Sequence, residues 1–260
     1  MTIINFDPAG GIIQKKVVQK PIQIKKRGCI KKIKNILSKL FKLDIDRIIL
    51  GNNETSVLHY ILNWLGIKNP VLITTNHEYI SIVRMAEGKD VSRYVTRPSS
   101  NLRAGIPAPE KPFVQSKITI NYKDIEQFKK DIAKKIKNKN RAILLLISHV
   151  SRITGEIFRI KEIFDYIEKL NQYRKSDEKI YLIVDGAQSV FTFPIEPKKY
   201  SHIYLGTSSK ALGAEPTVGF AFLNLKLRIP DSLLSSKRAL ISFFQLLENF
   251  SRNTKEIHAS

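Results

Sequence analysis

Short apolar runs that alternate with helical periodicity constrain the fold of this chain more than any other feature. Runs rich in Ile, Leu and Val recur between Ile48 and Leu223, and polar residues seldom interrupt them. Strands that are apolar along their whole length are buried on both faces, as in parallel sheets flanked by helices. The sequence therefore predicts an α/β fold with a mainly parallel sheet sandwiched by helices.

The apolar pattern places the individual elements. Strands are expected at residues 48–50, 71–75, 117–122, 142–147, 180–184, 202–205 and 218–223, with a short extended piece at 3–6. Helical spacing covers residues 29–42, 54–65, 80–86, 122–138, 160–172 and 232–250. Residues 91–123 are proline-rich and irregular, which predicts a long loop that returns as one short strand. We expect three segments: a basic N-terminal segment with an amphipathic helix (1–47), the sheet domain (48–228) and a C-terminal helical segment (229–260).

The net charge of +21 leaves two interpretations open. Residues 1–42 carry eleven Lys or Arg side chains against one acid, Asp7, which suits contact with nucleic acid or another polyanion. The alternative is a lysine-rich, solvated surface, and we favour it because Phe41 is the single aromatic residue near the basic cluster. Nucleic-acid binding through residues 1–42 thus stays open without being preferred.

Cysteine use and hydropathy bear on the compartment. Cys29 is the only cysteine, so the chain forms no internal disulfide. No apolar run reaches the length of a membrane span, and the first residues lack the pattern of a signal peptide. We expect a cytoplasmic protein without a membrane segment or a metal site, in which Cys29 is a small buried residue.

The stretch from Ile180 to Leu212 carries the strongest functional signal. Asp185 ends one apolar run, and Lys210 follows the next run. Polar residues also follow the other predicted strands, at 52–56, 77–79 and 148–152. Because the carboxyl ends of parallel strands meet in one crevice, these side chains should converge. The bland alternatives are a structural carboxylate, a surface lysine, a surface loop histidine and an ordinary N-cap.

A lysine, a carboxylate, an amide, an imidazole and several hydroxyls near a helix N-terminus suit pyridoxal 5'-phosphate (PLP). The lysine amine forms a Schiff base with the aldehyde, and the carboxylate keeps the pyridine nitrogen protonated. Hydroxyls and helix N–H groups hold the phosphate dianion. The Asp185–Lys210 spacing, after two buried strands, therefore favours a PLP site.

The motif VDGAQ followed by a Ser/Thr-rich turn and Lys210 resembles the class V aminotransferase family of fold-type I PLP enzymes, which includes cysteine desulfurases. INFDPAGG, LGNNETSVLHYIL, TTNHEYIS and LISHVSRITGEIFRIKEI resemble further family segments in the same order. The likeness runs from about Ile4 to Asn224. It implies the large domain of an aspartate aminotransferase-like PLP-dependent transferase.

The resemblance also implies a role for each matching residue. Lys210 would be the Schiff-base lysine and the catalytic proton carrier, and Asp185 would pair with the pyridine nitrogen. Gln188 would bind the ring hydroxyl, with His77 stacked on one ring face and Ala187 packed on the other. The phosphate would lie among these residues: Asn53, Glu54, Thr55, Thr207 and Ser209.

The chain departs from the family at several positions. Ser209 stands where the family usually has histidine, and Arg152 stands where desulfurases have asparagine. Arg152 would contact the ring hydroxyl or a substrate carboxylate, or turn to solvent. The family's small C-terminal domain, with a substrate-binding arginine and the desulfurase cysteine, has no clear counterpart here, and Cys29 lies too early to replace that cysteine.

Two functions are expected from this resemblance. The first is a homodimeric PLP enzyme that acts on the amino group or side chain of a small amino acid, by transamination or a lyase reaction. The second is a catalytically degenerate or truncated relative that binds PLP or serves as a basic interaction protein.

Overall fold

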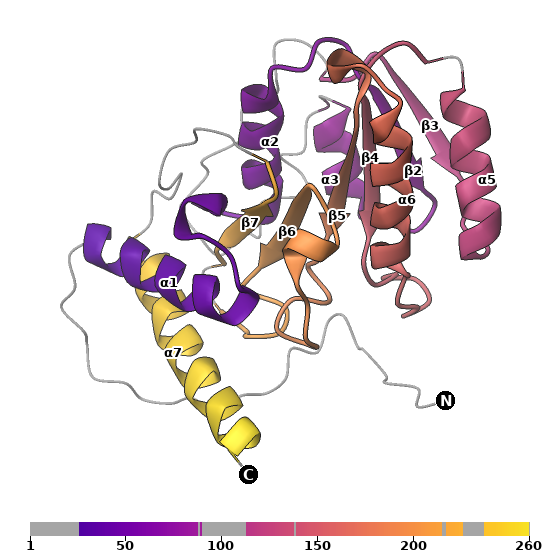
Figure 1. Ribbon diagram of the computed structural model, residues 1–260. Helices are drawn as coiled ribbons and strands as arrows, with labels where there is room; N and C mark the ends of the chain where they lie inside the picture. Colours follow the sequence, from indigo (N-terminus) through magenta and orange to yellow (C-terminus); the bar gives the residue numbers. More distant parts are fainter. Residues whose placement is uncertain are drawn as a thin grey trace.

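The computed structural model describes residues 26–87, 89, 113–137, 139–214, 217–225 and 237–259. The extended piece expected at residues 3–6, the first part of the basic segment and most of the irregular stretch before residue 113 lie outside these ranges. The described residues form one mixed sheet with helices on both of its faces (Figure 1).

The sheet has seven strands in the order β1-β7-β6-β5-β4-β2-β3. They are β1 (Ile48–Gly51), β2 (Val71–Thr75), β3 (Ser116–Ile120), β4 (Ile143–Ser148), β5 (Ile180–Asp185), β6 (Ile203–Thr207) and β7 (Gly219–Leu223). The five strands from β3 to β6 in this order are mutually parallel, whereas β7 runs antiparallel to both β6 and β1. The predicted mainly parallel sheet is confirmed.

The helices divide between the two faces of the sheet (Figure 1). Their bounds are α1 (Lys26–Phe41), α2 (Glu54–Leu65), α3 (Ile80–Ala86), α5 (Ile125–Ile136), α6 (Ile160–Gln172) and α7 (Lys237–Ala259). Helices α2 and α3 cover one face, and α1, α5, α6 and α7 cover the other. Helix α7 extends beyond the end predicted at residue 250.

Alternate side chains of each strand enter two separate cores. In β4, Ile143 and Leu145 pack with α5 and α6, while Leu144 and Leu146 pack with α2 and α3. All four are at most 1% exposed. Burial on both faces explains why the strand reads as an unbroken apolar run, since neither side chain direction reaches water.

Helices α1 and α7 lie side by side against the β1–β7 end of the sheet (Figure 1). Ile33 and Leu37 of α1 are fully buried in the same core as Leu240. The Cys29 thiol lies 3.4 Å from the Leu240 carbonyl oxygen, and burial raises its pKa. The expected docked helix and buried cysteine are confirmed, while the segment boundaries at 47 and 229 stay predictions.

Strand register brings the functional segments to one edge of the sheet. Ser148 pairs with Asp185 at the ends of β4 and β5, and Asp185 also pairs with Leu205 of β6. Because β7 runs antiparallel, its first residue, Gly219, pairs with Thr207 at the end of β6. Gly219 pairs on its other side with the last residue of β1, which precedes α2.

In the described ranges, no helix is both long and apolar enough to cross a membrane.

Candidate functional site

Asp185 is the centre of the site. It ends β5, the middle strand of the sheet, and is only 7% exposed. Burial raises its pKa, while a hydrogen bond from the Ala187 N–H (3.0 Å to Oδ1) and the charge of Lys210 lower it. Lys210 lies in the exposed turn after β6. The structure thus places the predicted amine near enough for its charge to act on the predicted carboxylate.

The N-terminus of α2 lies next to this pair. The Asn53 side chain accepts from the Ser56 N–H at 2.8 Å, and the Ser56 hydroxyl lies 3.2 Å from the Asn53 N–H, so the two form a capping box. Asn53 is therefore an ordinary N-cap by its side chain. The N–H groups of Glu54 and Thr55 belong to the first turn, where no carbonyl of the same helix accepts them. They remain suited to an anion.

Gly219 lets this helix approach the sheet. A Cβ atom there would lie 2.0 Å from the Asn53 carbonyl carbon and 2.2 Å from the Glu54 nitrogen. Backbone atoms cannot yield as a flexible side chain does, so only glycine permits this contact. The sequence analysis did not single out Gly219, because its role depends on a partner more than 160 residues away in the chain.

Glu54 turns its side chain into the site instead of toward water. It is 9% exposed, and its carboxyl group interacts with that of Asp185. Burial raises the pKa of Glu54 well above its ordinary value, the negative charge of Asp185 raises it further, and Lys210 opposes the shift. Glu54 therefore keeps a proton that it shares with Asp185. The sequence analysis placed Glu54 near the phosphate through its backbone and did not foresee this contact.

A group of hydroxyls lies where β6 ends and the chain enters β7. Thr207 Oγ1 lies 2.9 Å from Thr217 Oγ1 and 3.2 Å from Ser209 Oγ. The buried Ser208 hydroxyl accepts from the Val218 N–H at 2.8 Å and ties the Lys210 turn to the start of β7. Thr207 and Ser209 are thus held at the same sheet edge as the N-terminus of α2.

His77 follows β2 and is 8% exposed, so it is not the surface loop histidine of the bland interpretation. Its Nδ1 lies 2.9 Å from Ser151 Oγ, and its ring meets the edge of Phe158 with centroids 5.3 Å apart. The Thr75 hydroxyl accepts from the His77 N–H at 3.1 Å. The two ring contacts therefore fix the orientation of the imidazole, and the backbone hydrogen bond holds the residue at the end of β2.

Glu78 lies in the predicted polar segment 77–79, and the structure gives it contacts that the sequence does not reveal. Its carboxylate accepts the Thr75 and Ser148 hydroxyls, each at 2.6 Å. Burial raises the pKa of Glu78 to about 8, against the lowering effect of these hydroxyls, and the charge of Asp185 adds to the rise. Its place directly after a buried strand was a usable signal.

Among the described residues, no group of His, Cys, Asp and Glu side chains has the arrangement of a metal site.

A buried polar chain supports the turn after Asp185. Tyr204 Oη lies 2.7 Å from Ser189 Oγ and 2.5 Å from His149 Nδ1. The Ser189 hydroxyl in turn donates to the Gly186 carbonyl at 3.1 Å. Burial lowers the pKa of His149 to about 4 and raises that of Tyr204, so both are neutral at pH 7. These hydrogen-bonded side chains hold the turn without adding charge beneath Asp185.

The other predicted residues lie around this centre. Ala187 and Gln188 are half-buried in the turn after β5, and the Gln188 carbonyl accepts from the Thr192 hydroxyl. Arg152 is exposed, and its guanidinium lies over the ring of Tyr79, 5.0 Å from the centroid. Arg152 is thus placed on an exposed surface next to the His77 segment, stacked on an aromatic ring.

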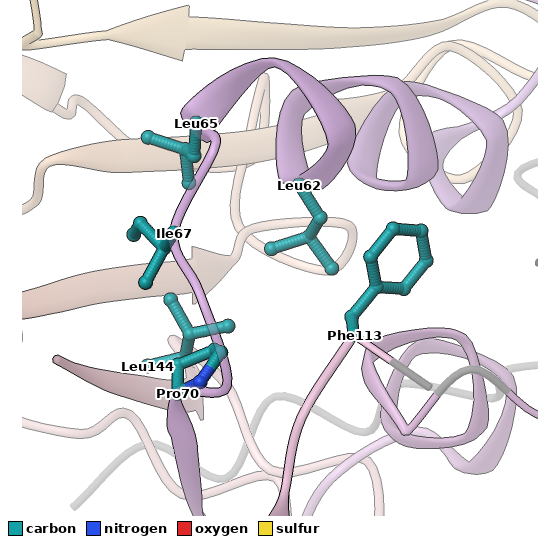
Figure 2. Close-up of a pocket in the computed structure, with 6 residues that line it drawn as sticks. All are labelled: Leu62, Leu65, Ile67, Pro70, Phe113 and Leu144. Atoms are coloured by element: carbon teal, nitrogen blue, oxygen red, sulfur yellow. The ribbon is translucent and has the colours of Figure 1, made fainter. Parts of the chain in front are cut away.

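A small apolar hollow lies away from this edge (Figure 2). In this view Leu62 and Phe113 lie together on one side of it, and Ile67, Pro70 and Leu144 lie on the other. Its volume of about 10 Å³ is far below the usual range of ligand sites, and its lining offers no polar side chain. The hollow is a packing feature unrelated to the polar cluster.

Comparison with solved structures yields the same architecture at low sequence identity. A variant of the cystine C–S lyase C-DES with glycine covalently linked to its PLP cofactor superimposes with a TM-score of 0.65 at 14% identity, over 88% of this chain and 61% of that one. An apo cysteine desulfurase from Thermococcus onnurineus NA1 gives 0.59 at 15% identity, over 87% and 57%. A serine palmitoyltransferase from Sphingomonas wittichii gives 0.61 at 12% identity, over 86% and 51%.

The chain has the fold of the large domain of fold-type I PLP enzymes. No protein-family model matches its sequence, and no curated protein matches it either. The chain spans 51–61% of the length of these three solved structures. Identity this low shows a shared fold, so activity and ligands must be argued from this chain's own site.

Proposed function

We propose that this chain binds pyridoxal 5'-phosphate covalently through Lys210. The observation that carries the proposal is a buried carboxylate, Asp185, whose pKa is lowered by the charge of Lys210, at the carboxyl ends of the parallel strands. The shared fold supports it, since one of the superimposed structures carries a PLP cofactor. In this fold class, ligands bind at that edge.

The residues present fit the cofactor. Asp185 would accept a hydrogen bond from the protonated pyridine nitrogen, and its carboxylate charge stabilises that proton. Thr207, Ser209 and the first N–H groups of α2 supply donors for a phosphate dianion, which the dipole of α2 also favours. The Glu54 carboxyl, whose Oε1 has no hydrogen-bond partner among the described residues, lies where the ring would reach Asp185.

The remaining residues would orient the ring. His77 is held by Ser151 and Phe158, so its imidazole offers a fixed flat face. Ala187 would pack on the opposite face, and Gln188 would bind the ring hydroxyl. Arg152 would supply a guanidinium for a carboxylate at the exposed rim, since its side chain is already stacked on Tyr79.

Bound PLP supplies an electron sink for carbanionic chemistry next to an amino group. The chain's own part is proton handling and water exclusion. Lys210 Nζ would take and return a proton at the reacting carbon once its amine is free. The turn from Gly186 to Ser189, fixed by Tyr204, keeps Asp185 in place during that transfer. We propose a small amino acid as substrate, acted on at its amino group or side chain.

The finer assignment belongs to the same proposal. The order of motifs supports membership of the class V aminotransferase family and hence a homodimer. The single buried cysteine, Cys29, suits a cytoplasmic location. The departures at Ser209 and Arg152 favour a second candidate, a degenerate relative that binds the cofactor without turnover. Exposed lysines on α1 suit the basic interaction role within that alternative.

The test is an absorbance titration of the folded chain with PLP. A visible band that differs from that of free PLP, and that borohydride removes, is expected for the wild type. Lys210→Ala should lose the band, while Lys199→Ala, which changes an exposed lysine paired with Glu196, should keep it. A wild-type chain without the band would contradict the proposal. If amino acids leave the band unchanged, the degenerate candidate is favoured over the enzyme.

A further inference from the structure

The position of Glu54 differs from that of most acids in a first helical turn. Such acids usually face water, where they interact with the helix dipole. Glu54 is instead 9% exposed, and its Oε1 has no hydrogen-bond partner among the described residues. Its carboxyl group interacts with that of Asp185, which is 7% exposed. Two carboxyl groups in one buried space hold a proton between them, because both cannot ionise there.

Only one described cation moderates this pair. Lys210 acts on both carboxyl groups, but it is exposed and lies after the end of β6. Tyr204 of β6, beneath the pair, is neutral, and Glu78 after β2 adds a further acid that interacts with Asp185. The surroundings therefore favour one negative charge on Asp185 and a proton on Glu54.

We propose that Glu54 occupies, in the cofactor-free chain, the place on Asp185 that the pyridine nitrogen takes, so that cofactor binding displaces Glu54 and releases its proton. The inference rests on the proposed function. Before binding, the Glu54 O–H donates to the Asp185 carboxylate. After binding, the ring N–H donates to that carboxylate, and Glu54 turns to water as a carboxylate. There its pKa returns to the ordinary acidic range of a solvated glutamate, so its proton enters the solvent at neutral pH.

Two substitutions distinguish the proton that Glu54 would release from the space that its side chain occupies next to Asp185. Glu54→Gln keeps the shape and a donor toward Asp185 but has no proton to release. Glu54→Ala removes the occupant altogether. Glu162→Gln is the matched control, since it changes a half-buried first-turn glutamate of α6 that pairs with Arg159, away from the site.

Calorimetric titration of PLP in two buffers of different ionisation heat measures the protons exchanged. The wild type should release about one proton per site more than Glu54→Gln. The difference between the two proteins is the relevant quantity, because the proton changes of the cofactor itself are the same in both and cancel. Glu54→Ala should bind PLP about ten- to a hundredfold more tightly than the wild type, because no hydrogen bond must be broken first. Glu162→Gln should match the wild type in both quantities.

A second measurement needs neither cofactor nor variant. Carbon-13 titration of the wild-type carboxyl groups should show Glu54 titrating far above its ordinary range. An ordinary titration of Glu54 would overturn the inference. So would equal proton release and affinity in the wild type and both Glu54 variants, while the proposed function would stand. Absence of PLP binding in every variant would overturn the proposed function and this inference together, although the titration would still report the Glu54–Asp185 pair.

Discussion

Ser148 and Asp185 are register partners at the ends of β4 and β5, and the Ser148 hydroxyl donates to Glu78 at 2.6 Å. This relationship brings a second acid under the influence of Asp185. Hydroxyls at the strand ends hold Glu78, but burial disfavours the ionised form of its carboxyl group. Among the described residues, Lys210 is the cation that acts on Asp185 and Glu54, so acidic groups outnumber it at this end of the sheet.

The first prediction concerns stability and the proton on Glu78. The unfolded chain ionises this group above about pH 4.5, whereas the folded chain keeps the proton up to about pH 8. The folded state binds more protons in this window, so its unfolding free energy should fall as the pH rises from 4.5 to 8. Glu78→Gln should remove that part of the decline, as measured by denaturant unfolding at several pH values.

Glu87→Gln is a control of opposite sign. Lys117 and Lys89 pair with Glu87 and lower its pKa, so Glu87 stabilises the fold above pH 4.5 and loses that effect as the pH falls. Its substitution should cost stability at pH 7 and little in acid. A wild-type stability that does not fall relative to Glu78→Gln between pH 4.5 and 8 would contradict the first prediction.

The second prediction separates binding from folding at Asp185. Asp185→Asn should weaken PLP binding by about ten- to a hundredfold, since a hydrogen bond between charged groups is lost. The fold should persist, because the substitution also removes a buried charge. Absorbance titration and thermal unfolding check the two parts. Unchanged affinity would show that Asp185 does not contact the cofactor.

The third prediction concerns the contact between β7 and α2. Gly219→Ala should displace the Asn53–Glu54 backbone, with a loss of about 1–3 kcal/mol in unfolding free energy and weaker phosphate binding. Gly28→Ala, at an exposed position inside α1, should instead stabilise the chain by about 0.5–1 kcal/mol. Inorganic phosphate competition and chemical unfolding measure both effects. Equal behaviour of the two variants would contradict the close contact.

The fourth prediction concerns the buried polar chain beneath the site. Tyr204→Phe should cost about 1–3 kcal/mol of unfolding free energy, because it leaves buried His149 and Ser189 groups without their partner. Tyr166→Phe removes a half-buried hydroxyl that makes a long 3.3 Å bond to the Lys129 carbonyl, so its cost should stay below about 1 kcal/mol. Urea unfolding measures the unfolding free energy of both variants. Similar losses in the two would contradict the supporting role of the Tyr204 hydroxyl.

The sequence predicts the sheet well, because burial on both faces leaves an unambiguous apolar run. The bounds 71–75, 80–86 and 160–172 agree with β2, α3 and α6. Strand direction is different: β7 carries no sequence signal for its antiparallel course. The gathering of Asp185, Lys210 and His77 at one edge follows from parallel topology alone.

The side-chain partners could not be predicted in the same way. Asn53 was placed in the phosphate loop, yet its side chain caps α2. Glu54 and Glu78 look like ordinary polar residues until the register sets them near Asp185. Arg152 depends on the exposed ring of Tyr79, which no periodicity reveals. The local pattern of apolar residues predicts helices and strands. The side-chain contacts of the site join residues that are far apart in the sequence, so this pattern does not reveal them.

The most direct test of covalent PLP binding is peptide mass mapping after borohydride reduction of the PLP-loaded chain. The account predicts one phosphopyridoxyl group per chain, located on Lys210 and absent from Lys210→Ala. Modification spread over exposed lysines such as Lys198 and Lys199, with Lys210 unmodified, would contradict the central claim.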